Sequence, residues 1–315
     1  MKPLNTIFCG TPDFALPSLE LLANHPAINL KMIITMPDRR SGRGKQLVPP
    51  PVATFAKENK LPLLQTENLN HEQQLISDLQ QDPCDLIIVL AFAQFLGSKL
   101  LDLPKVGCFN IHTSLLPKYR GAAPIQYAIL NNDKITGVSI QKMVKKMDAG
   151  DIACTDQLAI AANETGGQLY TRLKFQAALT LNRFLDEQLY GQVNYIAQDE
   201  NDATYAPSIS KEQGRLHFAS SRCQDVLNQI RAFTPRPGTF CFLNGERLKV
   251  FAAAKTAEKV KEGELDTSFN SLLVGTCDGA LRLTSVQLAG KKRCSDQELL
   301  NGFSNRSSNN KLEIS

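Results

Sequence analysis

The stretch "DLIIVLAFA", residues 85–93, is apolar along almost its whole length. A short run of this kind predicts a strand buried on both faces, as strands of parallel sheets are. Shorter apolar runs lie on both sides of it and predict further strands at 5–10, 30–35, 61–65, 106–111 and 136–143. Segments with helical spacing lie between them, at 14–25, 51–59 and 71–80 and from Pro124 onward. This alternation predicts an α/β fold in which helices cover a parallel sheet.

A different pattern follows the long amphipathic helix expected over 165–189. Residues 198–215 are polar with little apolar periodicity and indicate a linker. Beyond them, a helix expected over 221–233 precedes short β-type runs separated by Gly, Asn and Asp, a spacing typical of a small, partly closed β-barrel. We therefore expect a domain at 1–197, a linker at 198–215 and a second domain at 216–315.

The composition is that of an ordinary globular protein, with 43% hydrophobic and 21% charged residues in 315. No apolar run approaches the roughly 20 residues that span a bilayer, and the N-terminus carries no signal-peptide pattern. The eight cysteines include no CxxC pair, which argues against a disulfide framework and against structural zinc. These features predict a cytoplasmic protein that does not bind a membrane.

Positive charge is concentrated in the C-terminal third. Residues 207–315 hold 16 Lys and Arg and 11 Asp and Glu, a net charge of +5, whereas residues 1–206 carry −1. An anionic partner for this third is therefore expected. A second basic segment, 35–51, contains Arg39, Arg40, Arg43 and Lys45 among glycines and prolines. A solvated surface loop would explain it, but long loops in compact domains tend to be functional, and guanidinium groups suit phosphate.

Polar residues gather at the end of the strand expected over 106–111. Asn110 and His112 are two residues apart, so their side chains point to the same side of the strand. Ligands of open parallel sheets bind at this carboxyl edge. Asp148 follows the next predicted strand in a turn bounded by glycine, although Asp151 fits equally well on spacing alone. A lone histidine is more often structural, and Asp148 by itself would be assigned to capping its own turn.

Together these residues suit acyl-type transfer. Asn110 supplies a neutral donor for a carbonyl oxygen, His112 donates to the same oxygen or moves a proton, and Asp148 orients the histidine. The sequence has no serine elbow, so direct attack by an external nucleophile is expected rather than a covalent Ser–His mechanism.

Motifs across nearly the whole chain carry a family resemblance. They are "FCGTPDFALPSLE", "MPDRRSGRGKQLVPPPV", "FNIHTSLLPKYRGAAPIQYAI", "MDAGDI", "IRAFTPRPG" and "LAGKKRCSDQELLNG". With them the chain resembles the folate-dependent formyltransferases, and its basic loop and C-terminal motifs resemble the members that act on tRNA. The resemblance implies an N-terminal Rossmann-like parallel-sheet formyltransferase domain followed by a small C-terminal OB-like β-barrel domain that binds tRNA.

The implied activity is transfer of the formyl group of 10-formyltetrahydrofolate to the α-amino group of methionyl initiator tRNA, by a monomer and without a metal. Asn110, His112 and Asp148 align with the family's catalytic residues. The implied folate-binding residues are Ser114, Leu115, Leu116, Pro117, Val89, Leu90, Ala91 and Phe92, and the tRNA-binding residues are Arg39, Arg40, Arg43, Lys45, Lys291, Lys292 and Arg293, with Arg231 and Arg236 as further candidates. The chain departs from the family at Lys145 and Lys146, where related enzymes commonly carry an acidic residue or glycine.

Three other functions remain open at this point. A formyltransferase acting on an amino-sugar nucleotide would share the same three catalytic residues. A non-enzymatic RNA-binding protein would explain the basic segments but not the convergence of Asn, His and Asp. A nicotinamide-dependent dehydrogenase is disfavoured, because the first turn, "CGTPDFALP", lacks the other glycines of GxGxxG.

Overall fold

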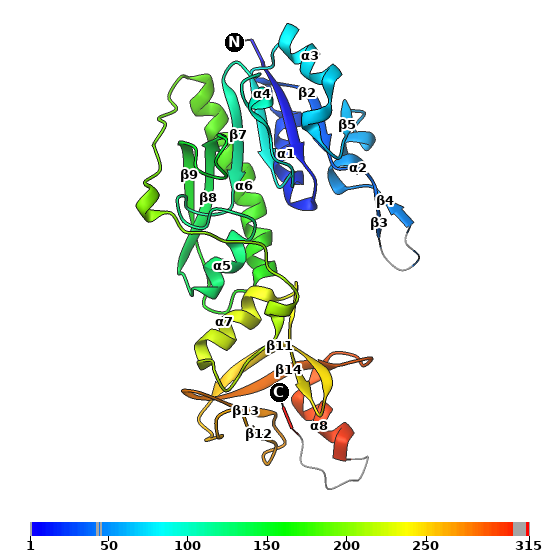
Figure 1. The fold of residues 1–315 in the computed structure, drawn as a ribbon, viewed down its shortest axis with the longest axis vertical. Helices are drawn as coiled ribbons and strands as arrows, with labels where there is room; N and C mark the ends of the chain where they lie inside the picture. Colours follow the sequence, from blue (N-terminus) through cyan, green and yellow to red (C-terminus); the bar gives the residue numbers. More distant parts are fainter. Residues whose placement is uncertain (1, 42–43, 45, 305–312, 315) are drawn as a thin grey trace. The chain divides into compact units, whose positions relative to one another are not determined.

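The structure is a computed structural model, and it describes residues 2–41, 44, 46–304 and 313–314. The chain forms two compact units (Figure 1). Unit 1 comprises Met1–Pro124, Ile135–Ala159 and Tyr170–Ala206, and unit 2 comprises Ile125–Lys134, Ile160–Leu169 and Pro207–Ser315. Within the described residues, no helix is both long enough and apolar enough to cross a membrane.

Unit 1 is built on a sheet that has seven strands within the described residues, in the order β5-β2-β1-β6-β7-β8-β9. The strands from β5 to β7 are parallel. The predicted α/β fold with a parallel-rich sheet is therefore confirmed. The strands are β1 (Leu4–Gly10), β2 (Ile28–Thr35), β5 (Leu63–Gln65), β6 (Leu86–Leu90), β7 (Gly107–His112), β8 (Ile135–Lys142) and β9 (Ile152–Ala159).

The prediction of a parallel sheet fails at one edge, where β8 runs antiparallel to β7 and β9 antiparallel to β8. The connection between β7 and β8 contains the helix α5 (Pro124–Leu130), which groups almost entirely with unit 2. It therefore does not form the crossover that would return the chain parallel to β7. Strand β9 was not predicted, because its sequence, IACTDQLA, is not an apolar run and six of its eight side chains are exposed or partly exposed.

Helices cover both faces of this sheet (Figure 1). On one face, residues of β1, β6 and β7 pack with residues of α3 and α4 in one buried cluster. On the other face, Phe109 of β7 contacts Phe184 of α6, with ring centroids 4.7 Å apart. Side chains alternate along β7, so Cys108 and Phe109 face opposite layers. The helices are α1 (Leu16–Asn24), α2 (Pro51–Glu58), α3 (Gln73–Gln81), α4 (Ser98–Leu101) and α6 (Gly166–Leu189), whose first residues belong to unit 2.

Three cysteines of this core behave as small hydrophobic residues, as predicted. Cys9, Cys84 and Cys108 are buried and have free thiols. Burial raises the pKa of Cys9, that of Cys84 to about 11 and that of Cys108 to about 12. These thiols are therefore protonated at neutral pH, and a protonated thiol is a poor nucleophile.

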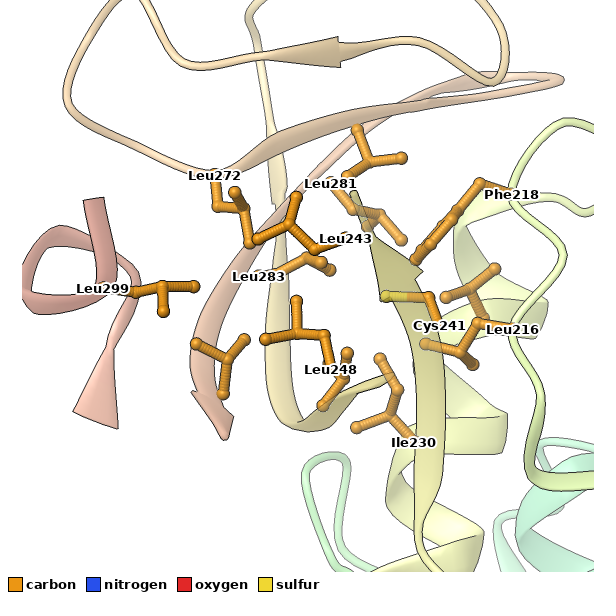
Figure 2. Packing of buried hydrophobic residues seen from close by; sticks show 14 of the residues in the cluster. Leu216, Phe218, Ile230, Cys241, Leu243, Leu248, Leu272, Leu281, Leu283 and Leu299 are labelled. Atoms are coloured by element: carbon orange, nitrogen blue, oxygen red, sulfur yellow. The ribbon is translucent and has the colours of Figure 1, made fainter. Parts of the chain in front are cut away.

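Unit 2 is an antiparallel half-barrel, in agreement with the predicted partly closed barrel. Its sheet has the strand order β10-β11-β14-β13-β12, and β15 pairs with β14. Leucines, valines and Cys241 fill the interior against Ile230 and Leu299 from two helices (Figure 2). The elements are α7 (Cys223–Phe233), β10 (Thr239–Leu243), β11 (Glu246–Thr256), β12 (Leu265–Asp266), β13 (Leu273–Thr276), β14 (Gly279–Leu288), β15 (Cys294–Ser295) and α8 (Asp296–Ser304).

Two short segments from the middle of the chain belong to unit 2. The Nδ2 of Asn228 donates to the carbonyl of Leu130 at 3.2 Å, and Arg231 Nη1 donates to the carbonyl of Glu164 at 3.4 Å. Compact units need not be independently folding domains, so the boundaries 1–197, 198–215 and 216–315 stay a prediction that limited proteolysis would test.

Asp296 is a buried charge that holds three parts of unit 2 together. Its carboxylate accepts hydrogen bonds from Arg282 Nε at 2.7 Å, Arg282 Nη2 at 3.1 Å and the Leu272 N–H at 3.1 Å, and its exposed fraction is 1%. Burial alone would raise the pKa of this carboxyl, but the hydrogen bonds from Arg282 and Leu272 outweigh it, so the pKa lies below its usual value.

Replacing Asp296 with asparagine is expected to lower the free energy of unfolding by about 2 kcal/mol at neutral pH, since charged hydrogen bonds are lost. Because the folded-state pKa is lowered, the carboxylate stabilises the fold above its unfolded pKa of about 3.9. The difference between wild type and variant should therefore shrink as the pH falls below about 4, through the folded pKa. Urea unfolding at several pH values measures it, with the exposed Glu258→Gln as a control. An equal difference at every pH would contradict the role of the charge.

Candidate active site

Asn110 and His112 lie on strand β7, and both take part in its pairing with β8. In the antiparallel register, Asn110 lies opposite Gln141 and His112 lies opposite Ser139. Residues two apart share a side of the strand, so a polar row forms on a sheet that is otherwise apolar here. His112 is buried, and Asn110 is partly buried.

Asp148 reaches this row from the loop after β8. The antiparallel β8 ends opposite Phe109, away from the carboxyl end of β7, so adjacency of strand ends is not what brings Asp148 near. Instead the loop folds back on β8, and Gly150 lies so close to the Lys142 carbonyl that a Cβ there would collide with it. Asp148 itself has a left-handed backbone, with φ of 50°. The glycine and this conformation together allow the chain to return.

The carboxylate of Asp148 lies between Asn110 and His112. Its Oδ1 accepts a hydrogen bond from Asn110 Nδ2 at 3.2 Å, and its Oδ2 accepts one from the Gly121 N–H at 2.9 Å. His112 Nδ1 lies 3.8 Å from Oδ2. Asp151, the alternative on spacing, is exposed and pairs with Lys142 through its backbone carbonyl. Asp148 is thus the carboxylate beside the histidine.

The orientation of the His112 ring follows from its neighbours. Nε2 lies 2.8 Å from the carbonyl oxygen of Tyr119, and because a carbonyl only accepts, Nε2 carries a proton. Protonation of Nδ1 would then make the ring cationic, with its charge facing Asp148. At 3.8 Å, an Nδ1–H is not committed to the carboxylate by a direct hydrogen bond. It remains able to donate to a substrate oxygen.

The segment after β7 is held rigidly. Ser114 is fully buried, and its Oγ donates to the Lys118 carbonyl at 2.6 Å. Ser139 Oγ donates to the Ser114 carbonyl and accepts from the Leu116 N–H. The peptide between Leu116 and Pro117 is cis. Whether Ser114, Leu115, Leu116 and Pro117 contact folate stays a prediction.

The other expected folate segment, at the end of β6, presents mainly its backbone. The side chains of Val89, Leu90 and Phe92 are buried, whereas Ala91 is exposed and has a φ of 51°. A Cβ on Gly10 would lie 3.0 Å from the Leu90 carbonyl, so glycine there lets the first turn approach this segment. Any contact of Val89, Leu90 or Phe92 with a ligand must therefore use backbone groups, and such contacts stay a prediction.

The basic loop of 35–51 has a short hairpin at its base. Strand β3 (Arg39–Ser41) pairs antiparallel with β4 (Gln46–Val48), and Arg39 and Arg40 are exposed. Arg43 and Lys45 lie outside the described residues. No group of three or more His, Cys, Asp and Glu side chains positioned to hold a metal ion occurs in the described part of the chain.

Unit 2 carries a basic–aromatic cluster that the sequence only partly revealed. Phe240 lies opposite Lys249 and Phe242 opposite Arg247, so the four side chains share one face of β10 and β11. The Arg247 guanidinium lies 3.6 Å from the Phe240 ring centroid. We define the basic–aromatic cluster as Arg215, Phe240, Phe242, Arg247, Lys249, Phe251 and Arg293.

Of the predicted tRNA-binding residues of unit 2, Arg293 belongs to this cluster. Its guanidinium lies 4.5 Å from the Phe251 ring centroid, and Lys291 and Lys292 beside it are exposed. Arg236 is exposed, whereas Arg231 is partly buried and engaged by Glu164 and Asn228. Sequence reasoning missed Arg247 and Lys249, although alternation with Leu248 and Val250 signalled an exposed basic side of that strand.

Comparison with known proteins defines the class. Residues 4–185 match the formyl transferase family, and residues 208–304 match the formyl transferase C-terminal domain. The chain therefore belongs to the formyl transferase family. It is 38% identical over 304 residues to the methionyl-tRNA formyltransferase of Geobacter sulfurreducens, which covers 96% of this chain and 95% of that protein.

Solved structures share the fold at low sequence identity. An N-formyltransferase from Helicobacter canadensis, in complex with folinic acid and dTDP-3-aminofucose, matches with a TM-score of 0.66 and 18% identity over 89% of this chain and 98% of that chain. HypX from Aquifex aeolicus in complex with tetrahydrofolic acid matches with a TM-score of 0.60 and 16% identity over 96% of this chain. The chain spans 48% of the length of HypX.

Proposed function

We propose that this chain transfers the formyl group of 10-formyltetrahydrofolate to the α-amino group of methionyl initiator tRNA, a step of translation initiation in the cytoplasm. The observation that carries the proposal is the convergence of Asn110, His112 and Asp148 in a member of the formyl transferase family. The name of the relative that is 38% identical over nearly the full length supports tRNA as the acceptor.

In the proposed reaction, the neutral α-amine attacks the formyl carbon and negative charge develops on the formyl oxygen. The second N–H of the Asn110 amide and the Nδ1–H of protonated His112 donate to that oxygen. Asp148 stabilises the imidazolium and accepts the amine proton through a water. The bond between the formyl carbon and the folate nitrogen then breaks, and that nitrogen takes up the proton as tetrahydrofolate leaves.

The co-substrate is proposed to bind beside these residues. Ser114–Pro117 is rigid, and the backbone at 89–92 is partly free of side-chain cover at Ala91, which supports a contact with a planar ring system. The chain's own contribution is then to hold the formyl group near Asn110 and His112 and to exclude competing nucleophiles.

The tRNA is proposed to contact both units. Arg39, Arg40, Arg43 and Lys45 would bind phosphates near the acceptor end, and Lys291, Lys292 and Arg293 would do so in unit 2 together with the rest of the basic–aromatic cluster. Arginine forks suit phosphates, and the partly buried rings of Phe242 and Phe251 can stack on unpaired bases. The net charge of +5 over 207–315 supports this assignment. We propose that the protein acts as a monomer.

Transfer of label from 10-formyltetrahydrofolate tests the function directly. Purified protein is incubated with labelled co-substrate and either methionyl-tRNA or an amino-sugar nucleotide. Label is expected on the aminoacyl-tRNA alone. Label on the sugar nucleotide alone would replace the proposal with the sugar-specific reaction, and binding of tRNA without any transfer would support a non-enzymatic RNA-binding role.

Removing the positive charges of the β3–β4 hairpin is expected to weaken the use of tRNA without affecting the use of the folate. The double variant Arg39→Gln, Arg40→Gln should raise the KM for methionyl-tRNA and leave the KM for the folate unchanged, because both side chains are exposed on the β3–β4 hairpin, which is not part of the sheet that contains β7. Lys31→Gln, an exposed charge of the same unit paired with Asp82, is the control. An unchanged KM for tRNA would argue against this loop as a contact.

A further inference from the structure

Arg120 is a buried cation that the proposed reaction does not use. Its exposed fraction is 1%, although it lies in the loop that follows β7. Its Nε and Nη2 donate to Gln198 Oε1 at 3.1 and 2.8 Å, and its Nη1 donates to both carboxylate oxygens of Glu200 at 3.1 Å. Burying a guanidinium is costly unless its donors are satisfied. The desolvation of a guanidinium in the loop beside Asp148 therefore points to a role of Arg120 at the site.

Arg120 fixes which way the Gln198 amide points. A guanidinium only donates, so the oxygen of the Gln198 amide must face it and the NH2 must face away. The freed NH2 meets acceptors only: the Asp148 carbonyl at 3.0 Å, the Gly150 carbonyl at 2.6 Å and Gln141 Oε1 at 3.3 Å. Gln198 therefore holds the backbone on both sides of Ala149, in the loop that presents Asp148.

The Gln141 amide is oriented in the same sense. Its oxygen accepts a hydrogen bond from the Gly150 N–H at 3.0 Å and another from the Gln198 NH2 at 3.3 Å. Both groups can only donate, so the oxygen of the Gln141 amide must face them. Its NH2 is therefore directed to Asp148 Oδ1, at 3.0 Å. Gln141 is buried in β8 directly opposite Asn110, so the same carboxylate oxygen receives an N–H from each strand.

We propose that Arg120, Gln198 and Gln141 form a directional hydrogen-bond relay that fixes Asp148 in position for formyl transfer. The proposal rests on the proposed function, because it gives these residues their role through Asp148. The relay begins at a group that can only donate and ends with an N–H on the carboxylate, so no amide in it can reverse without losing hydrogen bonds. Arg120, Gln198 and Gln141 are thus positioning residues.

The relay has a consequence for the chemistry. Asp148 has a left-handed backbone, which is unfavourable for a residue other than glycine. Hydrogen bonds to its carbonyl and to the Gly150 carbonyl hold this conformation, and the donor on Oδ1 leaves Oδ2 turned toward His112 Nδ1. A carboxylate released from the relay would keep its charge but lose this orientation. The expected defect is therefore in turnover rather than in substrate binding.

Two isosteric substitutions test the relay. In Gln198→Glu the carboxylate still pairs with Arg120 but cannot donate to Asp148, Gly150 or Gln141. In Gln141→Glu an acceptor replaces the donor on Asp148. Each is expected to lower kcat about 10- to 100-fold, the scale seen when outer partners of active-site ligands are lost, with unchanged KM for methionyl-tRNA and for the folate. If one variant fails to fold by circular dichroism, the other decides.

Glu200→Gln is the matched control, since it changes the other partner of the same arginine and lies outside the relay. It should keep the wild-type kcat. Wild-type kcat in both relay variants, or a loss of kcat matched by a rise in both KM values, would overturn the relay. Asp148→Asn is measured beside them: if it is inactive while the relay variants are fully active, the proposed function stands and the relay fails. An Asp148→Asn variant of full activity would overturn both.

Discussion

Replacing Asp148 with asparagine is expected to lower kcat for formyl transfer by about a hundredfold or more, the usual scale for acid–base and oxyanion groups. An asparagine has nearly the same shape but cannot stabilise a cationic His112 or accept a proton. The NH2 of the asparagine would also face a hydrogen-bond donor in either orientation, because Gln141 Nε2 donates to one carboxylate oxygen and the Gly121 N–H to the other. His112→Ala should have an effect of similar size.

Single-turnover rates at saturating folate and methionyl-tRNA measure this loss without a contribution from product release. Asp151→Asn is the matched control, since Asp151 lies three residues further on, is exposed and pairs through its backbone. It should retain the wild-type rate. A folded Asp148→Asn enzyme that turns over like the wild type would show that the roles assigned to these residues are wrong.

The sequence predicted much of the fold for a clear physical reason. Strands such as β6 are apolar on both faces because helices cover both sides of the sheet, and this burial leaves a continuous run that is easily recognised. The turns at Gly10 and before Pro124 separate these runs. Strand β9 was not recognised because only Ala153 and Cys154 are buried and its other side chains are exposed or partly exposed, so it leaves no apolar run.

The sequence predicted which three residues would lie together at the candidate site, but not the loop conformation that brings Asp148 to the other two. The spacing of Asn110 and His112 placed them on one side of a strand, and this alone brings them together. Asp148 joins them through a folded-back loop after an antiparallel strand, which depends on Gly150 and on long-range pairing that local patterns do not contain. Gln198 lay in a polar segment with no periodicity, so only the folded chain relates it to Asp148.

Unit 2 offers the second large effect, on tRNA affinity and its dependence on salt. The triple variant Arg247→Gln, Lys249→Gln, Arg293→Gln removes three exposed positive charges from the basic–aromatic cluster. If each charge neutralises one phosphate, the slope of log affinity against log salt should fall by about 2.7, since each contact contributes about 0.9 for a duplex. Transfer to methionyl-tRNA at low tRNA concentration should fall with it.

The core of unit 2 should tolerate the change, because Arg247, Lys249 and Arg293 are exposed and none of them belongs to the buried hydrophobic cluster. The triple variant Lys255→Gln, Lys259→Gln, Lys261→Gln carries the same loss of charge on the same unit but outside the cluster, and its slope should match the wild type. Affinity is measured by filter binding from low to high salt for all three proteins. Slopes that are equal for the two triple variants but lower than that of the wild type would mean that net charge, and not the cluster, attracts the tRNA. Three identical slopes would mean that none of these residues contacts phosphate.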